Sequence, residues 1–377
     1  MAKPEPHIVK MICHPYRIPF RQPFATAHGE LLAREGAIFE IVTDTDITGV
    51  GEVVTLPEFD GPSLEVLLGF LEKQAVTMQG SEISPMLQRI RDYIPHGINY
   101  APTLNGLEIA LLDILGKLKN VSIAQLLAVP HTLPRANVLI NATIGVREIS
   151  AAIEAARSAV AAGFSCIKLK VGIDATVEEE IRRISMVRAA IGPTPRLRLD
   201  ANEGWDFARA RAILAACKDF HIEYVEQPLP RDQLAEMHAL RQTTTIPIAA
   251  DEAISNQATI KGVLDATAAD ILIIKPSLLN GLYAAQYAIL RATKRQVRCV
   301  ITSAIETGVG VTAALHLAAA MPQVDLACGL ATLPLLADDL LVEPLQVAGG
   351  MMRVPDGPGL GVTVDWEKLA QYEIDVP

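Results

Sequence analysis

Cysteine is scarce in this sequence, and its spacing excludes the usual cysteine chemistry. The five cysteines are scattered, odd in number and never arranged as C-x-x-C. This pattern argues against a disulfide framework and against a thiolate zinc site. We therefore interpret every cysteine as a small buried apolar residue. The eight histidines form no cluster with metal-ligand spacing, and only His28 is kept as a candidate.

Positive charge and long apolar runs are also lacking. There are 33 Lys and Arg against 43 Asp and Glu, which gives a formal net charge of −10. We predict no nucleic-acid partner, because such a protein needs a basic face. A small anionic substrate is still compatible with this net charge, since a local group of lysines can make the potential at one site positive. No apolar run reaches about 18 residues, so we predict no membrane span and no membrane partner. The first residues, MAKPEPHIVKM, lack the apolar core of a signal peptide, and we expect a cytoplasmic location.

What the sequence does have is enough apolar material for a large core. Of 377 residues, 50% are hydrophobic and 20% charged. Up to about residue 60 the pattern indicates strands, with Ala37, Phe39 and Ile41 sharing one face. From residue 63 to 118 the apolar residues recur at helical spacing. Strands followed by helices favour an α+β domain, which we place at residues 1–130.

From about residue 136 the pattern changes to short apolar strands alternating with helices. The predicted strands are Val138–Ile144, Cys166–Val171, Arg196–Asp200, Ile222–Glu226, Ile246–Asp251, Ala269–Lys275, Val297–Thr302 and Val324–Gly329. Such alternation predicts a parallel sheet covered by helices. Eight strands favour a closed barrel over an open sheet, and no G-x-G-x-x-G follows the first strand to support a dinucleotide-binding fold. We place the barrel at residues 131–344 and expect the tail, about 345–377, to complete the first domain.

Acidic residues stand at the ends of three consecutive predicted strands. Asp200, Glu226, Asp251 and then Lys275 follow one another at intervals of 26, 25 and 24 residues, each about one βα unit. In a barrel, the carboxyl ends of the strands meet at one mouth. Three convergent carboxylates repel each other unless a cation lies between them. Oxygen ligands without His or Cys favour a hard cation, so we predict Mg²⁺, with Mn²⁺ as the alternative.

Lysines flank these acids. Lys168 and Lys170 are two residues apart on a strand and share a face, whereas Lys275 ends the sixth strand, half-way round an eight-stranded ring. A divalent cation and nearby ammonium groups lower a lysine pKa, so one lysine could act as a base near neutrality. This arrangement suits proton abstraction next to a carboxylate. Other strand-end residues, namely Asn202, Ser303 and Glu306, are candidates for binding the substrate.

These residues resemble the enolase superfamily, and within it the muconate lactonizing enzyme subgroup. The resemblance covers essentially the whole chain and implies a modified (β/α)7β barrel with an α+β capping domain. It implies that Lys170 is the acid/base, that Lys168 supports the substrate carboxylate, and that Lys275 acts from the opposite face. It also implies Asp200, Glu226 and Asp251 as ligands of Mg²⁺. A non-catalytic barrel that binds ligands would be expected to have lost one of these residues, and none is lost. The partner is then a small-molecule carboxylate, with a homo-oligomer as one option.

Segments outside these positions look like the o-succinylbenzoate synthases. They are P-F-R-Q-P-F-A-T-A-H-G, R-E-G at 34–36, G-V-G-E-V-V-T-L-P at 49–57 and A-C-G-L-A-T-L-P-L-L at 327–336. The resemblance implies Mg²⁺-dependent dehydration of 2-succinyl-6-hydroxy-2,4-cyclohexadiene-1-carboxylate in menaquinone synthesis. Dipeptide epimerases usually carry D-x-D where this chain has G-L-A-T. Racemisation of N-acylamino acids, epimerisation of dipeptides and cycloisomerisation of muconate remain alternatives.

Cap loops are expected to close over the substrate in such an enzyme. The residues that we expect near this closure are Phe24, Thr26, His28, Leu56 and Phe59. Closure of this kind would exclude water from the reaction.

Overall fold

The N-terminal part of the chain is an antiparallel sheet packed against helices. The computed structural model describes residues 5–26, 29–93 and 98–376. Strands β1 (Ile8–Thr26), β2 (Gly29–Thr43) and β3 (Thr48–Val54) pair in the order β1-β2-β3. They are followed by α1 (Leu64–Met78), α2 (Ile83–Arg91), α3 (Ala101–Lys119) and α4 (Ile123–Leu127). Ala37, Phe39 and Ile41 are fully buried, as their alternation predicts.

Helix α3 packs directly on β3, and glycine makes this close approach possible. A Cβ atom at Gly51 would meet the backbone carbonyl of Gly106 on α3. Most of α3 is buried, including Glu108 and Asp113, so the helix lies in the interior and not on the surface. The expected α+β arrangement of this region is therefore present.

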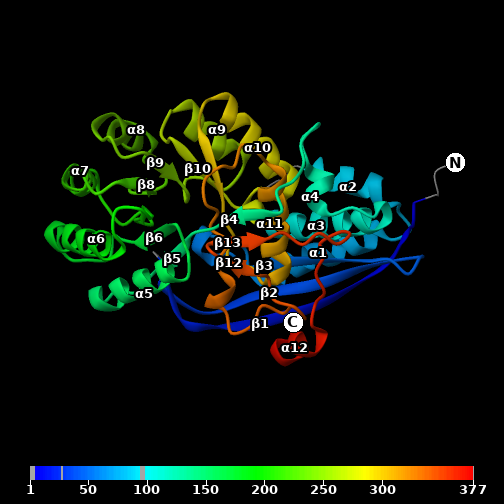
Figure 1. Cartoon of the computed structure of the whole chain (residues 1–377). Helices are drawn as coiled ribbons and strands as arrows, with labels where there is room; N and C mark the ends of the chain where they lie inside the picture. The colour runs from blue at the N-terminus through cyan, green and yellow to red at the C-terminus, as the bar shows by residue number, and fades with distance from the viewer. Residues whose placement is uncertain (1–4, 27–28, 94–97, 377) are drawn as a thin grey trace.

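Seven parallel strands alternate with helices in the rest of the chain and curl into a barrel (Figure 1). The sheet order is β11-β10-β9-β8-β7-β6-β5. The strands are β5 (Ala142–Ile144), β6 (Cys166–Lys170), β7 (Arg196–Asp200), β8 (Ile222–Glu226), β9 (Ile248–Ala250), β10 (Ile271–Ile274) and β11 (Arg298–Ile301). The helices are α5 (Ile149–Ala161), α6 (Val177–Ile191), α7 (Phe207–Ala216), α8 (Leu234–Thr243), α9 (Gln257–Asp265), α10 (Leu282–Lys294) and α11 (Gly308–Ala320). The modified barrel with an α+β cap is thus confirmed.

Two predicted strands are corrected by the structure. The predicted strand Val138–Ile144 is two strands: β4 (Asn137–Leu139) pairs with β13 (Met351–Arg353) of the tail, and only β5 joins the barrel. The predicted strand Val324–Gly329 is no continuous strand. Only Cys328 and Gly329 form bridges, to Ile140 and Thr302, because the chain crosses the gap between β5 and β11 within two residues. Four backbone hydrogen bonds of 2.7 to 3.1 Å close the barrel there.

The C-terminal tail returns to the N-terminal part. After β12 (Val347–Ala348) and β13, helix α12 (Trp366–Tyr372) lies beside β1 (Figure 1). Gly359 bridges to Ser122, and Glu373 bridges to Tyr16. The exact division of the chain at residues 130 and 344 stays a prediction.

Cap and barrel are joined by buried carboxylates. Glu52 of β3 accepts hydrogen bonds from the backbone N–H groups of Thr307 and Gly310, at 2.8 and 2.7 Å, at the start of α11. Glu108 of α3 accepts hydrogen bonds from the N–H groups that begin α10, at Leu282 and Tyr283. Neither α10 nor α11 has a capping side chain of its own. The cap therefore satisfies N-terminal donors that these helices would otherwise leave unpaired.

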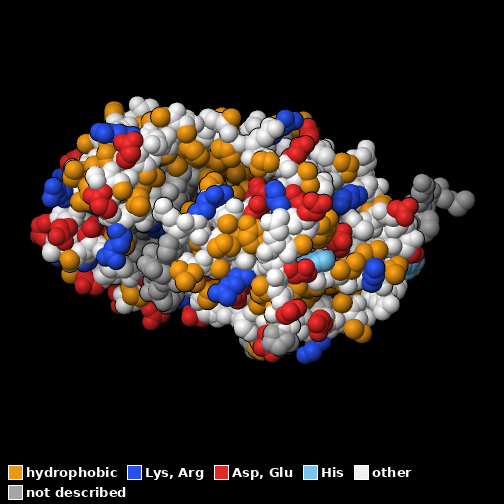
Figure 2. Space-filling view, turned by 90° about the horizontal axis from the view of Figure 1, so that it is seen from below, with side chains coloured by type: hydrophobic (Ala, Val, Ile, Leu, Met, Phe, Trp, Pro, Cys, Tyr) orange, Lys and Arg blue, Asp and Glu red, His pale blue; other side chains and the backbone are white. Residues whose placement is uncertain are grey.

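Charges of both signs are mixed on the face shown in Figure 2, and most of the cysteines are buried. Acidic and basic side chains are interspersed over the face in Figure 2 and do not gather by sign. In the described part of the chain, no helix is long and apolar enough to cross a membrane.

All five cysteines are free and four are buried, but Cys13 is exposed. The interpretation of Cys13 as buried is wrong, because alternation along β1 turns Tyr16 and Ile18 inward and Cys13 outward.

Candidate active site

Neighbouring strands bring the predicted acids to one rim of the barrel. Lys170, Asp200 and Glu226 are register partners across β6, β7 and β8. Asp251 follows β9 directly, on the next strand. The side chains of these three acids are almost completely buried. One βα unit between consecutive acids therefore does place them at equivalent positions.

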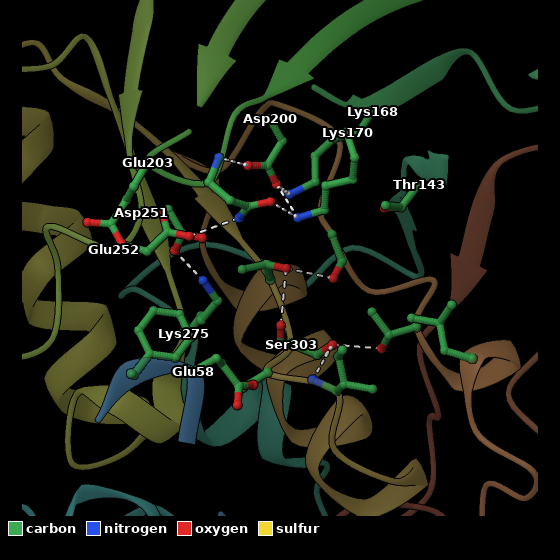
Figure 3. Close-up of a pocket in the computed structure, with 18 of the residues that line it drawn as sticks. Glu58, Thr143, Lys168, Lys170, Asp200, Glu203, Asp251, Glu252, Lys275 and Ser303 are labelled. Carbon is green, nitrogen blue, oxygen red and sulfur yellow. Dashed lines mark hydrogen bonds and ion pairs between the residues drawn. The ribbon is translucent and has the colours of Figure 1, made fainter. Parts of the chain in front are cut away.

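The two lysines of β6 pair with these carboxylates. Lys168 Nζ lies 2.8 Å from both Asp200 Oδ2 and Glu226 Oε1, and so bridges the two acids. Lys170 Nζ lies 2.7 Å from Asp200 Oδ2 and donates to Asn202 Oδ1 at 2.7 Å. Both side chains point toward Asp200 in Figure 3.

Lys275 approaches from the other side of the pocket. It follows β10, which is separated from β6 by β7, β8 and β9 in the sheet. Its Nζ forms an ion pair with Asp251 and lies 4.5 Å from the centre of the Phe59 ring, a cation–π contact with the cap. In Figure 3, Lys170 and Lys275 reach the pocket from different walls.

The other predicted residues occupy different positions. Asn202 lies between Lys170 and Glu252, whose Oε1 accepts from Asn202 Nδ2 at 2.8 Å. Ser303 lines the pocket and exchanges a hydrogen bond of 2.6 Å with Thr332. Glu306 is buried outside the residues that line the pocket, and its Oε2 accepts from the N–H of Ala304 at 2.6 Å.

The charges at this rim perturb one another. Burial, followed by the negative charge of Asp200, raises the pKa of Glu226 to about 7. Although burial opposes ionisation, Lys168 and Lys170 hold the pKa of Asp200 well below its usual range. Burial tends to lower the pKa of Lys168 and of Lys275, because it disfavours an ammonium group. The negative charges of Asp200 and Asp251 outweigh this effect and raise the pKa of Lys168 and of Lys275, respectively. The ammonium groups of these two lysines are the countercharges of the acids, and a lysine pKa lowered by a bound cation stays a prediction.

The same ion pairs bear on the predicted metal site. Over residues 5–26, 29–93 and 98–376, no three Asp, Glu, His or Cys side chains are arranged to hold a metal ion. Lys168 pairs with Oδ2 of Asp200 and Oε1 of Glu226, and Lys275 pairs with Asp251. The all-oxygen donor set fits a hard cation by its chemistry. The magnesium site stays a prediction.

The pocket between cap and barrel holds about 850 Å³ of space, including its open mouth. Besides the predicted residues, it is lined by side chains to which the strand-end pattern gives no role: Glu58, Thr143, Glu203, Arg231, Glu252, Thr332 and Leu335. Glu252 stands beside Asp251 at the end of the fifth predicted strand and Glu203 directly follows Asn202, so adjacency is a signal that could have assigned both to the pocket. Of the five residues expected in the cap closure, Phe59 lines the pocket, and Leu56 is buried nearby. His28 lies outside the described residues, as do the side chains of Phe24 and Thr26.

Comparisons with known proteins agree with this geometry. Residues 151–368 match the family model of the enolase C-terminal domain, and residues 8–128 match the N-terminal domain of mandelate racemase and muconate lactonizing enzymes. An o-succinylbenzoate synthase of Thermobifida fusca is 39% identical over 224 residues, which are 59% of this chain and 67% of that protein. The N-succinyl-L-Arg/Lys racemase of Bacillus cereus is 27% identical, with 95% of each chain covered.

Solved structures give the same result. The substrate complex of the L-Ala-D/L-Glu epimerase from Bacillus subtilis has a TM-score of 0.86 at 27% identity and covers 94% of this chain and 98% of its own. The family models together span both the cap and the barrel. The chain therefore belongs to the enolase superfamily, in its muconate lactonizing enzyme subgroup.

Proposed function

We propose that the protein is an o-succinylbenzoate synthase, which dehydrates 2-succinyl-6-hydroxy-2,4-cyclohexadiene-1-carboxylate. The observation that carries this choice is the uncharged pocket wall formed by Gly329, at the last barrel bridge, and by Thr332 and Leu335 after it. A substrate with a free ammonium group finds no carboxylate on this wall, whereas the carboxylate that ends a succinyl arm meets no like charge there. The 39% identity to the Thermobifida fusca synthase supports the same choice.

Lys170 is the base in this proposal. Its neutral Nζ removes the proton alpha to the ring carboxylate, and the electrons move into an enediolate. The C–O bond to the ring hydroxyl then breaks, Lys170 returns the proton to the departing hydroxide, and water leaves as the ring becomes aromatic. One lysine serves both steps when the proton and the hydroxyl lie on the same face of the ring.

The remaining residues bind and orient the substrate. Lys168 neighbours Lys170 on β6 and faces the substrate carboxylate, while Lys275 contributes fixed positive charge from the opposite wall. Phe59 of the cap, in contact with Lys275, excludes water from that wall. Asp200, Glu226 and Asp251 would hold Mg²⁺, which when bound supplies Lewis-acid stabilisation of negative charge on the carboxylate oxygens.

An assay with purified protein and Mg²⁺ tests this proposal. The diene acid, N-succinyl-L-amino acids and L-Ala-L-Glu are supplied separately at equal concentrations. We expect rapid conversion of the diene acid into the aromatic product. If the diene acid is not turned over and another acid is, the assignment as a synthase is wrong.

Racemisation of N-acylamino acids is the second candidate. The specific observation in its favour is the placement of Lys170 and Lys275 on opposite walls, as a two-base mechanism requires. The full-length similarity to the racemase of Bacillus cereus agrees with it. Exchange of the alpha proton of N-succinyl-L-amino acids in D₂O, with loss of optical rotation, would support this activity, and retention of the proton would exclude it.

A further inference from the structure

A chain of hydrogen bonds leads from Lys170 to a second acid on the rim. Lys170 Nζ donates to Asn202 Oδ1 at 2.7 Å, and Asn202 Nδ2 donates to Glu252 Oε1 at 2.8 Å. Three strand ends, those of β6, β7 and β9, are linked in this way. Glu252 follows the predicted metal ligand Asp251 but belongs to a different set of contacts.

The orientation of the Asn202 amide decides what Lys170 meets. An amide offers an oxygen acceptor at one end and an NH₂ donor of similar size at the other. Once Lys170 has taken up the substrate proton, its ammonium group is a donor only, so a reversed amide would then place donor against donor. Oε1 of Glu252 accepts from Asn202 Nδ2 in the structure and so attracts the NH₂ end of the amide. Glu252 therefore selects the amide orientation that Lys170 needs.

The backbone around Asn202 is built to keep this side chain in place. Asn202 and Glu203 have φ angles of 42° and 66°, in the left-handed region that residues other than glycine rarely adopt. The N–H of Asn202 donates to Asp200 Oδ1 at 3.2 Å, and the N–H of Glu203 donates to the carbonyl of Gln227 at 2.8 Å. Such a conformation persists only where the surroundings hold it, and it occurs often at functional sites.

Glu252 itself is placed for this role and has no competing partner on its second oxygen. The residue is 8% exposed and lines the pocket. Among the described residues, no donor reaches its Oε2. Exchange of Oε2 for an amide nitrogen would therefore break no contact, and Glu252→Gln retains an Oε1 acceptor for Asn202.

We propose that Glu252 is a positioning residue for the base: it orients the amide of Asn202, which in turn holds Lys170. The proposal deepens the proposed function and rests on Lys170 as the base. It predicts that Glu252 acts on turnover through Asn202 alone.

A double-mutant cycle tests the proposal on whichever acid the wild-type protein turns over. Glu252→Met and Asn202→Leu should each lower kcat by about 10- to 100-fold, with little change in KM, since misplacement of a reacting group by about 1 Å has effects of this size. The double variant should be no slower than Asn202→Leu. Glu252→Gln should stay within about threefold of the wild type, as the conservative variant that keeps the acceptor.

The rate at which Lys170 is acetylated tests the same contact and needs no assay of enzyme activity. Acetic anhydride should acetylate Lys170 several-fold faster in Glu252→Met and in Asn202→Leu than in the wild type, relative to the exposed Lys73 in the same sample. If the wild type turns over no acid that is offered, the proposed function fails, and the acetylation rates still decide this proposal.

Three results would overturn the role of Glu252. The first is an unchanged Lys170 acetylation rate in Glu252→Met. The second is additive effects on kcat in the double variant. The third is a rise in the Mg²⁺ concentration for half-maximal activity as the main effect of Glu252→Met, which would make Glu252 a metal ligand instead.

Discussion

At the scale of single residues, Lys168 has the most unusual position in the site. One ammonium group bridges two buried carboxylates, Asp200 and Glu226, at 2.8 Å each. Its side chain is 13% exposed, so solvent screens these pairs only weakly. Lys168 thus supplies countercharge to two of the three carboxylates that the sequence assigns to a cation.

Substitution of Lys168 by methionine tests whether Mg²⁺ can replace the lysine as the positive charge beside these carboxylates. Removal of one partner from a buried ion pair usually costs about 3–5 kcal/mol, so we expect Lys168→Met to lower the unfolding free energy of the metal-free protein by this amount. Mg²⁺ should restore part of the loss, because a cation can then join Asp200 and Glu226. Urea unfolding with and without Mg²⁺ measures both effects.

Lys261→Met is the matched control. Lys261 pairs with Asp265 on the exposed side of α9, and such pairs contribute about 0–1 kcal/mol. The variant should show little loss and no restoration by Mg²⁺. A Lys168→Met protein that responds to Mg²⁺ no more than the control would count against a cation at these carboxylates.

Whether the place of a site residue could be predicted from the sequence depended on the kind of structure that positions it. The convergence of the strand-end residues could be predicted from spacing, because the strands repeat every 24 to 26 residues. These residues end or directly follow their strands: Asp200, Glu226, Asp251 and Lys275. The contact of Glu252 with Asn202 could not, because it depends on left-handed backbone angles in a loop. Periodicity carries no information on such angles.

At the scale of elements, barrel closure depends on a very short contact. Cys328 and Gly329 complete the ring by single bridges to Ile140 and Thr302. The sequence predicts a full strand at 324–329 because most of its residues are apolar, but apolar character does not show how many of them pair with a neighbouring strand. The split of the predicted strand 138–144 has a similar origin, since the partner of β4 is the distant tail strand β13.

Gly329→Ala tests the closure. A Cβ atom at this position would meet the side chain of Thr302, so the bridge must move. We expect a loss of about 1–3 kcal/mol in unfolding free energy, the usual cost of overpacking, and lower activity because Gly329 lines the pocket.

Gly69→Ala is the corresponding control. Gly69 lies within α1, and an added Cβ there would meet no other atom within 4 Å. Alanine favours helix by about 1 kcal/mol over glycine, so this variant should be slightly more stable than the wild type. Equal stability of Gly329→Ala and the wild type in thermal unfolding would show that the closure tolerates a side chain.

At the scale of the whole molecule, cap and barrel share buried acids and therefore depend on each other. Glu52 accepts from the start of α11 and also from Tyr16 Oη at 2.6 Å. Burial raises the pKa of Glu52 to about 7, against an ordinary value of 4.5. Between these two values the folded protein binds more protons than the unfolded chain, so stability falls as pH rises.

Glu52→Gln tests this dependence. A pKa difference of this size means that the contribution of Glu52 to the unfolding free energy falls by about 3 kcal/mol between about pH 4.5 and pH 7. The wild type should therefore lose about this much more unfolding free energy than Glu52→Gln when urea unfolding at pH 5 is compared with pH 8. Parallel pH dependence in the two proteins would mean that Glu52 keeps an ordinary pKa in the fold.

In the proposed reaction, Lys170, with its neighbouring acids and lysines, removes the proton alpha to a substrate carboxylate. The most direct measurement is turnover of the diene acid with Mg²⁺ by the wild type and by Lys170→Ala, with circular dichroism to confirm that both are folded. We predict conversion to the aromatic product by the wild type and a decrease of about 100- to 10,000-fold in the variant. A folded Lys170→Ala protein that retains the wild-type rate would contradict the account.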